Sequence, residues 1–156
     1  LSKYGEVGYG ELVKRDKNGQ SQLFCRELVG KSAELLRDLV REQGITHITC
    51  VPSLRSDIVK SFAKELATSL KIEFVELLDK LPSRPQNEME NSSYQCANAF
   101  KAFVAKENIS YPEKVILVDD IVNSRWTLTV CGYKIMEQGT REVYPFVLAD
   151  NSYGEV

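Results

Sequence analysis

Histidine and closely spaced cysteines are nearly absent from this 156-residue chain. The single histidine, His47, lies in a run of strand-forming residues, and we interpret it as structural. No two cysteines are separated by only two residues, so neither a histidine-based catalytic triad nor a zinc site has the residues that it needs. We therefore expect no metal site built from the protein alone, and cysteines that are small core residues kept reduced in the cytoplasm. These cysteines are Cys25, Cys50, Cys96 and Cys131.

Three further absences narrow the functional classes. No apolar run approaches membrane-spanning length and no secretory signal is visible, so we expect no membrane partner. The motif G-x-x-x-x-G-K-[ST] is missing, which means that no nucleotide-hydrolysing motor lies within these residues. A net charge of −2 and a pI near 5.6 do not indicate the clustered basic residues of a nucleic-acid-binding domain.

The order of the expected elements indicates an α/β fold with an open parallel sheet flanked by helices. The length suits one domain, and 43% hydrophobic residues suit a globular core. Helices are predicted at residues 26–42, 56–70, 92–105 and 127–138, with Gly44 and Gly139 as helix stops. Strands are predicted at residues 8–13, 45–51, 71–77, 115–118 and 142–149, and a long exposed loop at residues 80–92. The oligomeric state is left open.

The most informative pattern is VILVDDIVNSRWTLT at residues 115–129. Its four leading apolar residues form a continuous run, which is typical of a buried parallel strand. Asp119 and Asp120 follow at the carboxyl end of this strand, where ligands of open α/β sheets bind. A polar turn and a helix start come next, and a helix N-terminus offers N–H groups to a phosphate. Because two adjacent carboxylates can accept hydrogen bonds from neighbouring sugar hydroxyls, the pattern suits a ribose 5-phosphate.

This segment resembles the phosphoribosyl-pyrophosphate (PRPP) motif of type I phosphoribosyltransferases. The resemblance implies the fold of that family with a flexible hood loop, and Mg²⁺ that arrives with the pyrophosphate if the protein is an enzyme. It also implies that Asp119 and Asp120 bind the ribose and that the turn binds the 5-phosphate. The residues of the turn are Asn123, Ser124, Arg125, Trp126 and Thr127.

Two residues of the turn depart from the family pattern. Several members have an Asp that acts as a general base where this chain has Asn123, and Asn cannot take up a proton. The family usually has a small residue such as Gly where this chain has Arg125. Gly allows positive φ and a close backbone approach to phosphate, whereas Arg adds a fork of donors. These departures favour ligand binding over unchanged chemistry and leave the catalytic residues unknown. Trp126 has two open roles, stacking on a base or pinning the turn onto the core.

An earlier strand-to-helix turn occupies the position of the family's pyrophosphate-binding loop. Its residues Ser53, Leu54 and Arg55 combine backbone N–H groups at a helix start with a guanidinium group. We interpret them as a second anion site; the alternative is an ordinary connection that carries a surface arginine.

The loop between the two turns resembles the corresponding region of ComF-type competence proteins, which have a spaced Gln, an Asn and an Ala-Phe pair. Here these are Gln86, Asn98 and residues 99–100, and we assign Arg84 to the same hood loop. The closest resemblance is to the C-terminal domain of bacterial RecQ-type ATP-dependent DNA helicases. It rests on Val-Pro-Ser-Leu-Arg at residues 51–55, Asn-Ser at 91–92 and the stretch 118–127. It implies that residues 1–156 are the C-terminal part of a larger helicase of DNA repair and recombination, with DNA as a partner of that parent chain.

Three functions remain open from the sequence. The first is a binding module within the helicase, whose ligand is PRPP, a nucleotide or a 5′-phosphorylated nucleic-acid end. The second is an active phosphoribosyltransferase that transfers ribose phosphate from PRPP to a base, in which positioning and leaving-group electrostatics supply the rate enhancement. The third is an interaction scaffold that kept the fold and lost the ligand.

Overall fold

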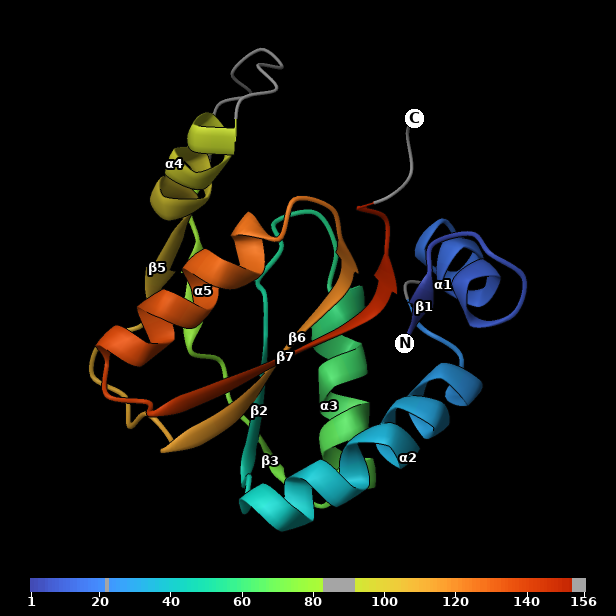
Figure 1. Cartoon of the computed structure of the whole chain (residues 1–156), viewed down its shortest axis with the longest axis horizontal. Coiled ribbons are helices and arrows are strands. Elements are labelled where there is room, and N and C mark those ends of the chain that lie inside the picture. Colours follow the sequence, from blue (N-terminus) through green and yellow to red (C-terminus); the bar gives the residue numbers. More distant parts are fainter. Residues whose placement is uncertain (22, 83–91, 153–156) are drawn as a thin grey trace.

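A five-stranded parallel sheet lies at the centre of the protein (Figure 1). The structure is a computed structural model and describes residues 1–21, 23–82 and 92–152. The strand order is β1-β7-β6-β2-β3, and every neighbouring pair is parallel. The strands are β1 (Ser2–Lys3), β2 (His47–Cys50), β3 (Glu73–Phe74), β6 (Lys114–Val122) and β7 (Glu142–Asp150).

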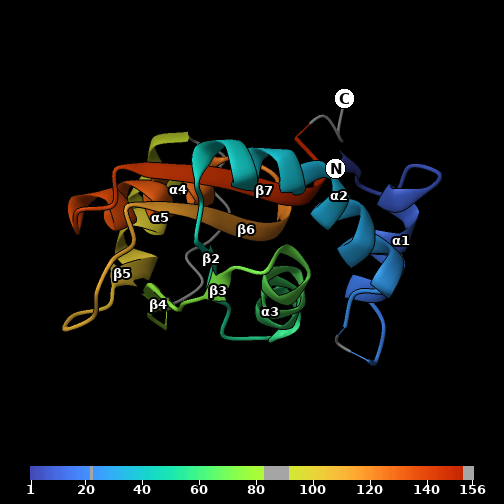
Figure 2. The same ribbon diagram turned by 90° about the horizontal axis from the view of Figure 1, so that it is seen from below.

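Helices cover both faces of this sheet, as the edge-on view in Figure 2 shows. Side chains of α2 (Arg26–Gln43) and α3 (Ile58–Leu70) pack on one face, and those of α5 (Trp126–Glu137) pack on the other. In β6, Ile116 and Val118 join the first hydrophobic cluster, and Val115 and Leu117 join the second. Because all four residues are fully buried, the run needs no polar alternation. The predicted α/β architecture is confirmed.

A small antiparallel pair of strands stands beside α5. It consists of β4 (Leu78–Lys80) and β5 (Phe103–Ala105), with α4 (Ser92–Ala102) above it (Figure 1). The rings of Phe100 on α4 and Tyr133 on α5 lie 6.1 Å apart and join this unit to the main body. We refer to β4, β5 and α4 together as the hood, because they flank the loop for which the resemblance predicts that role. Residues 83–91, which include Arg84 and Gln86, lie outside the described residues.

The predicted strand at residues 8–13 is wrong, because this segment belongs to α1 (Tyr9–Lys17). Its buried residues Gly10, Val13 and Asp16 recur every three positions, which is a helical and not a strand period. α1 packs closely on β1: a Cβ added at Gly10 would lie 1.8 Å from the carbonyl oxygen of Lys3. The glycine is therefore required by close approach, and it fixes where α1 lies.

Two further predictions need correction. Of the strand expected at residues 71–77, only Glu73–Phe74 pairs with β2, after which the chain leaves the sheet towards β4. The helix expected to reach residue 105 ends at Ala102, because Phe103–Ala105 pair with β4 as β5. The other predicted helices and strands are confirmed, including the helix stop at Gly44, which adopts the left-handed conformation at φ 63°. The loop expected at residues 80–92 lies largely outside the described residues, and its two end residues belong to β4 and α4. β6 is longer than expected, since it continues through both aspartates to Val122.

The cysteines match the expectation of small core residues in part. Cys50 and Cys131 are buried, Cys25 and Cys96 are half-buried, and all four are free thiols. His47 lies at the amino end of β2, with its Nε2 3.5 Å from a carboxylate oxygen of Glu73, which agrees with a structural role. Within the described ranges, no helix has the length and apolar character to cross a bilayer.

Candidate functional site

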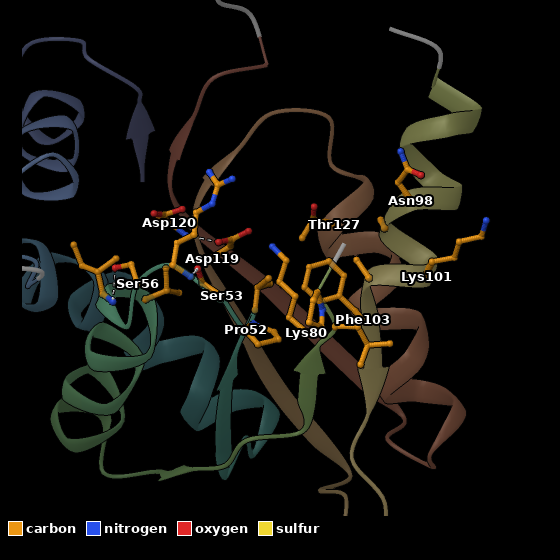
Figure 3. Close-up of a pocket in the computed structure, with 18 of the residues that line it drawn as sticks. Pro52, Ser53, Ser56, Lys80, Asn98, Lys101, Phe103, Asp119, Asp120 and Thr127 are labelled. Carbon is orange, nitrogen blue, oxygen red and sulfur yellow. Dashed lines mark hydrogen bonds between the residues drawn. The ribbon is translucent and has the colours of Figure 1, made fainter. Parts of the chain in front are cut away.

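The chain changes direction in the sheet between β2 and β6. From β2 it continues outward to β3, and from β6 it continues outward to β7 on the other side. Connections diverge at such a switch point and leave a crevice beyond the carboxyl ends of the strands. A cleft of about 940 Å³ opens there, between the end of β6, the turn after β2 and the hood (Figure 3).

Both predicted ribose-binding residues line this cleft. Asp119 Oδ1 accepts a hydrogen bond from the backbone N of Asp120 at 2.9 Å, and Asp120 Oδ1 accepts one from the backbone N of Ile121 at 2.7 Å. The second oxygen of Asp120 lies 2.8 Å from Nζ of Lys17, which reaches over from α1. Asp119 points into the cleft on the side of Thr127 (Figure 3). The end of β6 therefore presents two fixed and inequivalent carboxyl groups.

The Asp119 carboxyl has an unusually high pKa. Burial raises the pKa of the Asp119 carboxyl to about 7, and the neighbouring charge of Asp120 acts in the same direction. The backbone hydrogen bond from Asp120 and the charge of Lys17 lower it, but by less. Near neutral pH, Asp119 can therefore accept a hydrogen bond when ionised or donate one when protonated.

In the turn after β6, Arg125 adopts the left-handed conformation that Gly adopts most readily. Arg125 has φ 63° and ψ −13°, and its carbonyl oxygen accepts hydrogen bonds from the backbone N and Oγ1 of Thr129 in the first turn of α5. The guanidinium is exposed and lies 3.9 Å from the carboxylate of Asp150 at the end of β7. Asn123 accepts a hydrogen bond from Nδ2 of Asn151 at 3.0 Å. Two side chains of the turn are thus directed to the end of β7.

The five predicted phosphate-binding residues are therefore not equivalent. Thr127 lines the cleft, at the first turn of α5. Asn123, Ser124 and Arg125 are exposed, and Trp126 is half-buried at the start of the helix. None of these four is among the residues that line the described part of the cleft. At this end of the cleft, the groups that can contact an anion are Thr127 and the backbone N–H groups of the helix start.

The predicted pyrophosphate turn reaches the cleft through two of its three residues. Ser53 and Arg55 line it, whereas the Leu54 side chain is 59% exposed. Ser53 Oγ accepts a hydrogen bond from the backbone N of Arg55 at 3.2 Å, which shapes the turn. Ser56 Oγ accepts one from the backbone N of Ile58 at the start of α3. The turn thus ends on a helix N-terminus with one arginine beside it, a combination that can bind an anion.

The hood contributes residues that the sequence predicted only in part. Asn98 of α4 lines the cleft as expected, together with Gln95 and Lys101. Lys80 at the end of β4 also lines it, and its Nζ lies 5.3 Å from the centroid of the Phe103 ring. Lys80 is the first residue of the loop predicted at residues 80–92, which was a usable signal. No local signal pointed to Lys17.

The charge of the cleft suits an anionic ligand. Among its described lining residues, the cations Lys17, Arg55, Lys80 and Lys101 outnumber the two aspartates. Such a set concentrates anions in a recessed site. The described residues contain no cluster of three or more metal-binding side chains. Mg²⁺ commonly binds through one or two carboxylates plus substrate phosphates, so this donor set fits an ion that enters with a phosphorylated ligand.

Comparison with known proteins extends these observations to the fold. No protein-family model matches the sequence, and no curated protein matches it either. Among solved structures, an adenine phosphoribosyltransferase superposes with a TM-score of 0.59 at 18% sequence identity, over 82% of this chain and 70% of that one. The adenine phosphoribosyltransferase of Saccharomyces cerevisiae gives 0.58 at 18% identity, over 82% and 69% of the two chains. A purine phosphoribosyltransferase from Pyrococcus horikoshii gives 0.52 at 18% identity, over 86% and 81%. The chain therefore has the type I phosphoribosyltransferase fold.

Proposed function

We propose that this protein binds a ribose 5-phosphate ligand of the PRPP class in the cleft at the switch point. The observation that carries the proposal is the meeting of Asp119, Asp120, Thr127 and Arg55 in one recess, although they come from different elements. The sequence pattern and the fold of the solved structures support the same ligand class.

Each part of such a ligand has a matching group. Asp119 keeps one carboxyl oxygen free of the backbone contact and offers it to a ribose hydroxyl. The start of α5 with Thr127 receives the 5-phosphate through N–H groups and a hydroxyl. Arg55 and the start of α3 receive the pyrophosphate through a guanidinium and N–H groups. Mg²⁺, when bound with the pyrophosphate, neutralises charge on the leaving group.

Transfer of the ribose phosphate to a base is the second function that we propose. The observation that favours it is the extent of the cleft, which continues past the aspartates to Gln95, Asn98 and Phe103 of the hood. Gln95 and Asn98 offer two amides, which suit the hydrogen-bonding edge of a planar heterocycle. Asn123 is hydrogen-bonded to Asn151, and its amide cannot act as a general base. Transfer would therefore depend on positioning and on leaving-group stabilisation.

Calorimetric titration with PRPP tests the binding proposal. We expect Mg²⁺-dependent binding by the natural sequence and a loss of at least about tenfold in the variant Asp119→Asn/Asp120→Asn, since hydrogen bonds to charged acceptors contribute about 1.5–3 kcal/mol. The matched control Asp38→Asn/Glu42→Gln removes two exposed acids of α2 and should bind as the natural sequence does. Equal affinity in all three proteins would overturn the assignment of the ligand to Asp119 and Asp120, and absence of binding by the natural sequence would overturn the proposal and favour the scaffold function.

A screen of bases with Mg²⁺-PRPP then tests transfer. Release of pyrophosphate that depends on one base, and that is lost in the double aspartate variant, would support the enzyme. Binding without release for any natural base would leave a binding module.

We propose, on sequence resemblance alone, that this domain belongs to a RecQ-type helicase and meets DNA through its parent chain. An antibody raised against residues 1–156 tests this in lysate of the source cells. A band several times larger than the 156-residue chain, carrying DNA-dependent ATPase activity after capture, would support it. A band of the size of the chain itself would refute it.

A further inference from the structure

Helix α1 contributes a positive charge to the cleft, from a residue that belongs to none of the sequence motifs. Lys17 is the last residue of α1, and its ammonium lies 2.8 Å from Oδ2 of Asp120. The preceding residue, Asp16, is buried and accepts a hydrogen bond from the backbone N of Cys25 at 2.7 Å. Asp16 also pairs with Arg15 at 2.7 Å. These contacts fix the end of α1 and therefore the position of the Lys17 backbone.

The partner of Lys17 is almost enclosed. The Asp120 side chain is 10% exposed, whereas that of Lys17 is 38% exposed. One oxygen of Asp120 is held by the backbone of Ile121 and the other by Lys17. An ammonium has three donors and no acceptor. Lys17 therefore retains donors that face the same open cleft, which it lines together with Asp120.

Two carboxylates repel a polyphosphate that binds beside them. Like charges a few ångströms apart in a recess repel more strongly than in open water, because the recess screens them less. A ligand that places its ribose on Asp119 and Asp120 must bring its phosphates close to both. A cation fixed on one of these carboxylates removes much of the repulsion while it leaves Asp119 available to the ribose.

We propose that Lys17 is a specificity-determining residue that makes the acidic ribose site tolerant of highly charged ligands. The inference rests on the proposed function, because it concerns the same cleft. It identifies the ligand class as ribose phosphates with several negative charges, with selectivity over singly phosphorylated ribose supplied in part by α1.

The test compares two ligands of different charge, PRPP and ribose 5-phosphate, at constant Mg²⁺ and ionic strength. Lys17→Gln removes the charge but keeps an amide donor for Asp120, so the enclosed carboxylate stays hydrogen-bonded and folding is preserved. Lys17→Arg retains the charge. Lys14→Gln is the matched control, since Lys14 is an exposed lysine of the same helix that does not line the cleft. Circular dichroism melts confirm that each variant is folded.

We expect Lys17→Gln to weaken PRPP binding by about tenfold and ribose 5-phosphate binding by only about threefold, because the lost attraction scales with ligand charge. Lys17→Arg and Lys14→Gln should stay within about twofold of the natural sequence. Equal losses for the two ligands, or equal behaviour of Lys17→Gln and Lys14→Gln, would refute the role of Lys17 while leaving the proposed function intact. Failure of the natural sequence to bind either ligand would overturn the proposed function and this inference together.

Discussion

Replacement of Arg125 by Gly and by Ala should give an order of stability opposite to that of an ordinary helix. Arg125 adopts φ 63° just before α5. For a residue with a Cβ, the left-handed conformation costs about 1–2 kcal/mol, and Gly avoids this cost. Gly also loses about 0.5–1 kcal/mol more backbone entropy on folding than Ala. The difference leaves Arg125→Gly more stable than Arg125→Ala by about 0.5–1 kcal/mol.

The side chain itself contributes little to this comparison. The guanidinium of Arg125 is exposed, its contact with Asp150 is 3.9 Å long, and both variants lose it equally. Urea denaturation of the two variants measures the difference in the free energy of unfolding. The matched control is the pair Thr129→Gly and Thr129→Ala, at an exposed helical position one turn later. There the Ala variant should be more stable by about 1 kcal/mol. If Ala were also the more stable variant at position 125, the left-handed turn would be the wrong description.

Two further variants test the placement of α1 and the raised pKa of Asp119. Gly10→Ala should lower the free energy of unfolding by about 1–3 kcal/mol, because the new Cβ meets the carbonyl oxygen of Lys3 at 1.8 Å; Gly30→Ala in α2 has nothing within 4 Å and should instead gain about 0.5–1 kcal/mol in urea denaturation. A gain at both glycines would contradict the packing of α1 on β1. The Asp119 carboxyl has a pKa of about 7 in the folded state and near 4 in the unfolded state. Between these pH values the folded state binds more protons than the unfolded state, so the protein's free energy of unfolding falls as pH rises. Between pH 5 and pH 8, the free energy of unfolding of Asp119→Asn relative to the natural sequence should therefore rise, by about 1.4 kcal/mol for each pH unit below the folded pKa. Unfolding midpoints that shift in parallel for both proteins would argue against this expectation.

Local sequence patterns were sufficient to predict a strand that is buried on both faces of the sheet. The run at residues 115–118 is enclosed by α2 and α3 on one face and α5 on the other, so its composition alone predicts a central strand. The same pattern locates the two aspartates near the carboxyl end of this strand, although β6 continues through them to Val122. The helix stop at Gly44 is equally local, since its left-handed conformation depends on one residue.

The elements that the sequence missed depend on distant contacts. β4 and β5 have three residues each, which is too short for a periodic signal, and they exist because they pair with each other across the hood. α1 is defined by its approach to β1, and β1 in turn pairs with the carboxyl end of β7. The Lys17–Asp120 ion pair joins opposite parts of the chain, so no window along the sequence contains it. Site residues supplied by such contacts are visible only in three dimensions.

The two departures from the family pattern have one structural consequence. Asn123 pairs with Asn151, and Arg125 lies beside Asp150, so both side chains are turned to the end of β7. The backbone N of Asn151 also donates to the carbonyl oxygen of Val122, which fastens the turn to the same strand. The cleft thus receives from this turn only Thr127 and the start of α5. The arrangement is compatible with the proposed phosphate site, because recognition by N–H groups needs backbone geometry and not particular side chains. Acid–base assistance from position 123 does not survive it, so this turn supports binding of a ribose phosphate more strongly than it supports chemistry on a base.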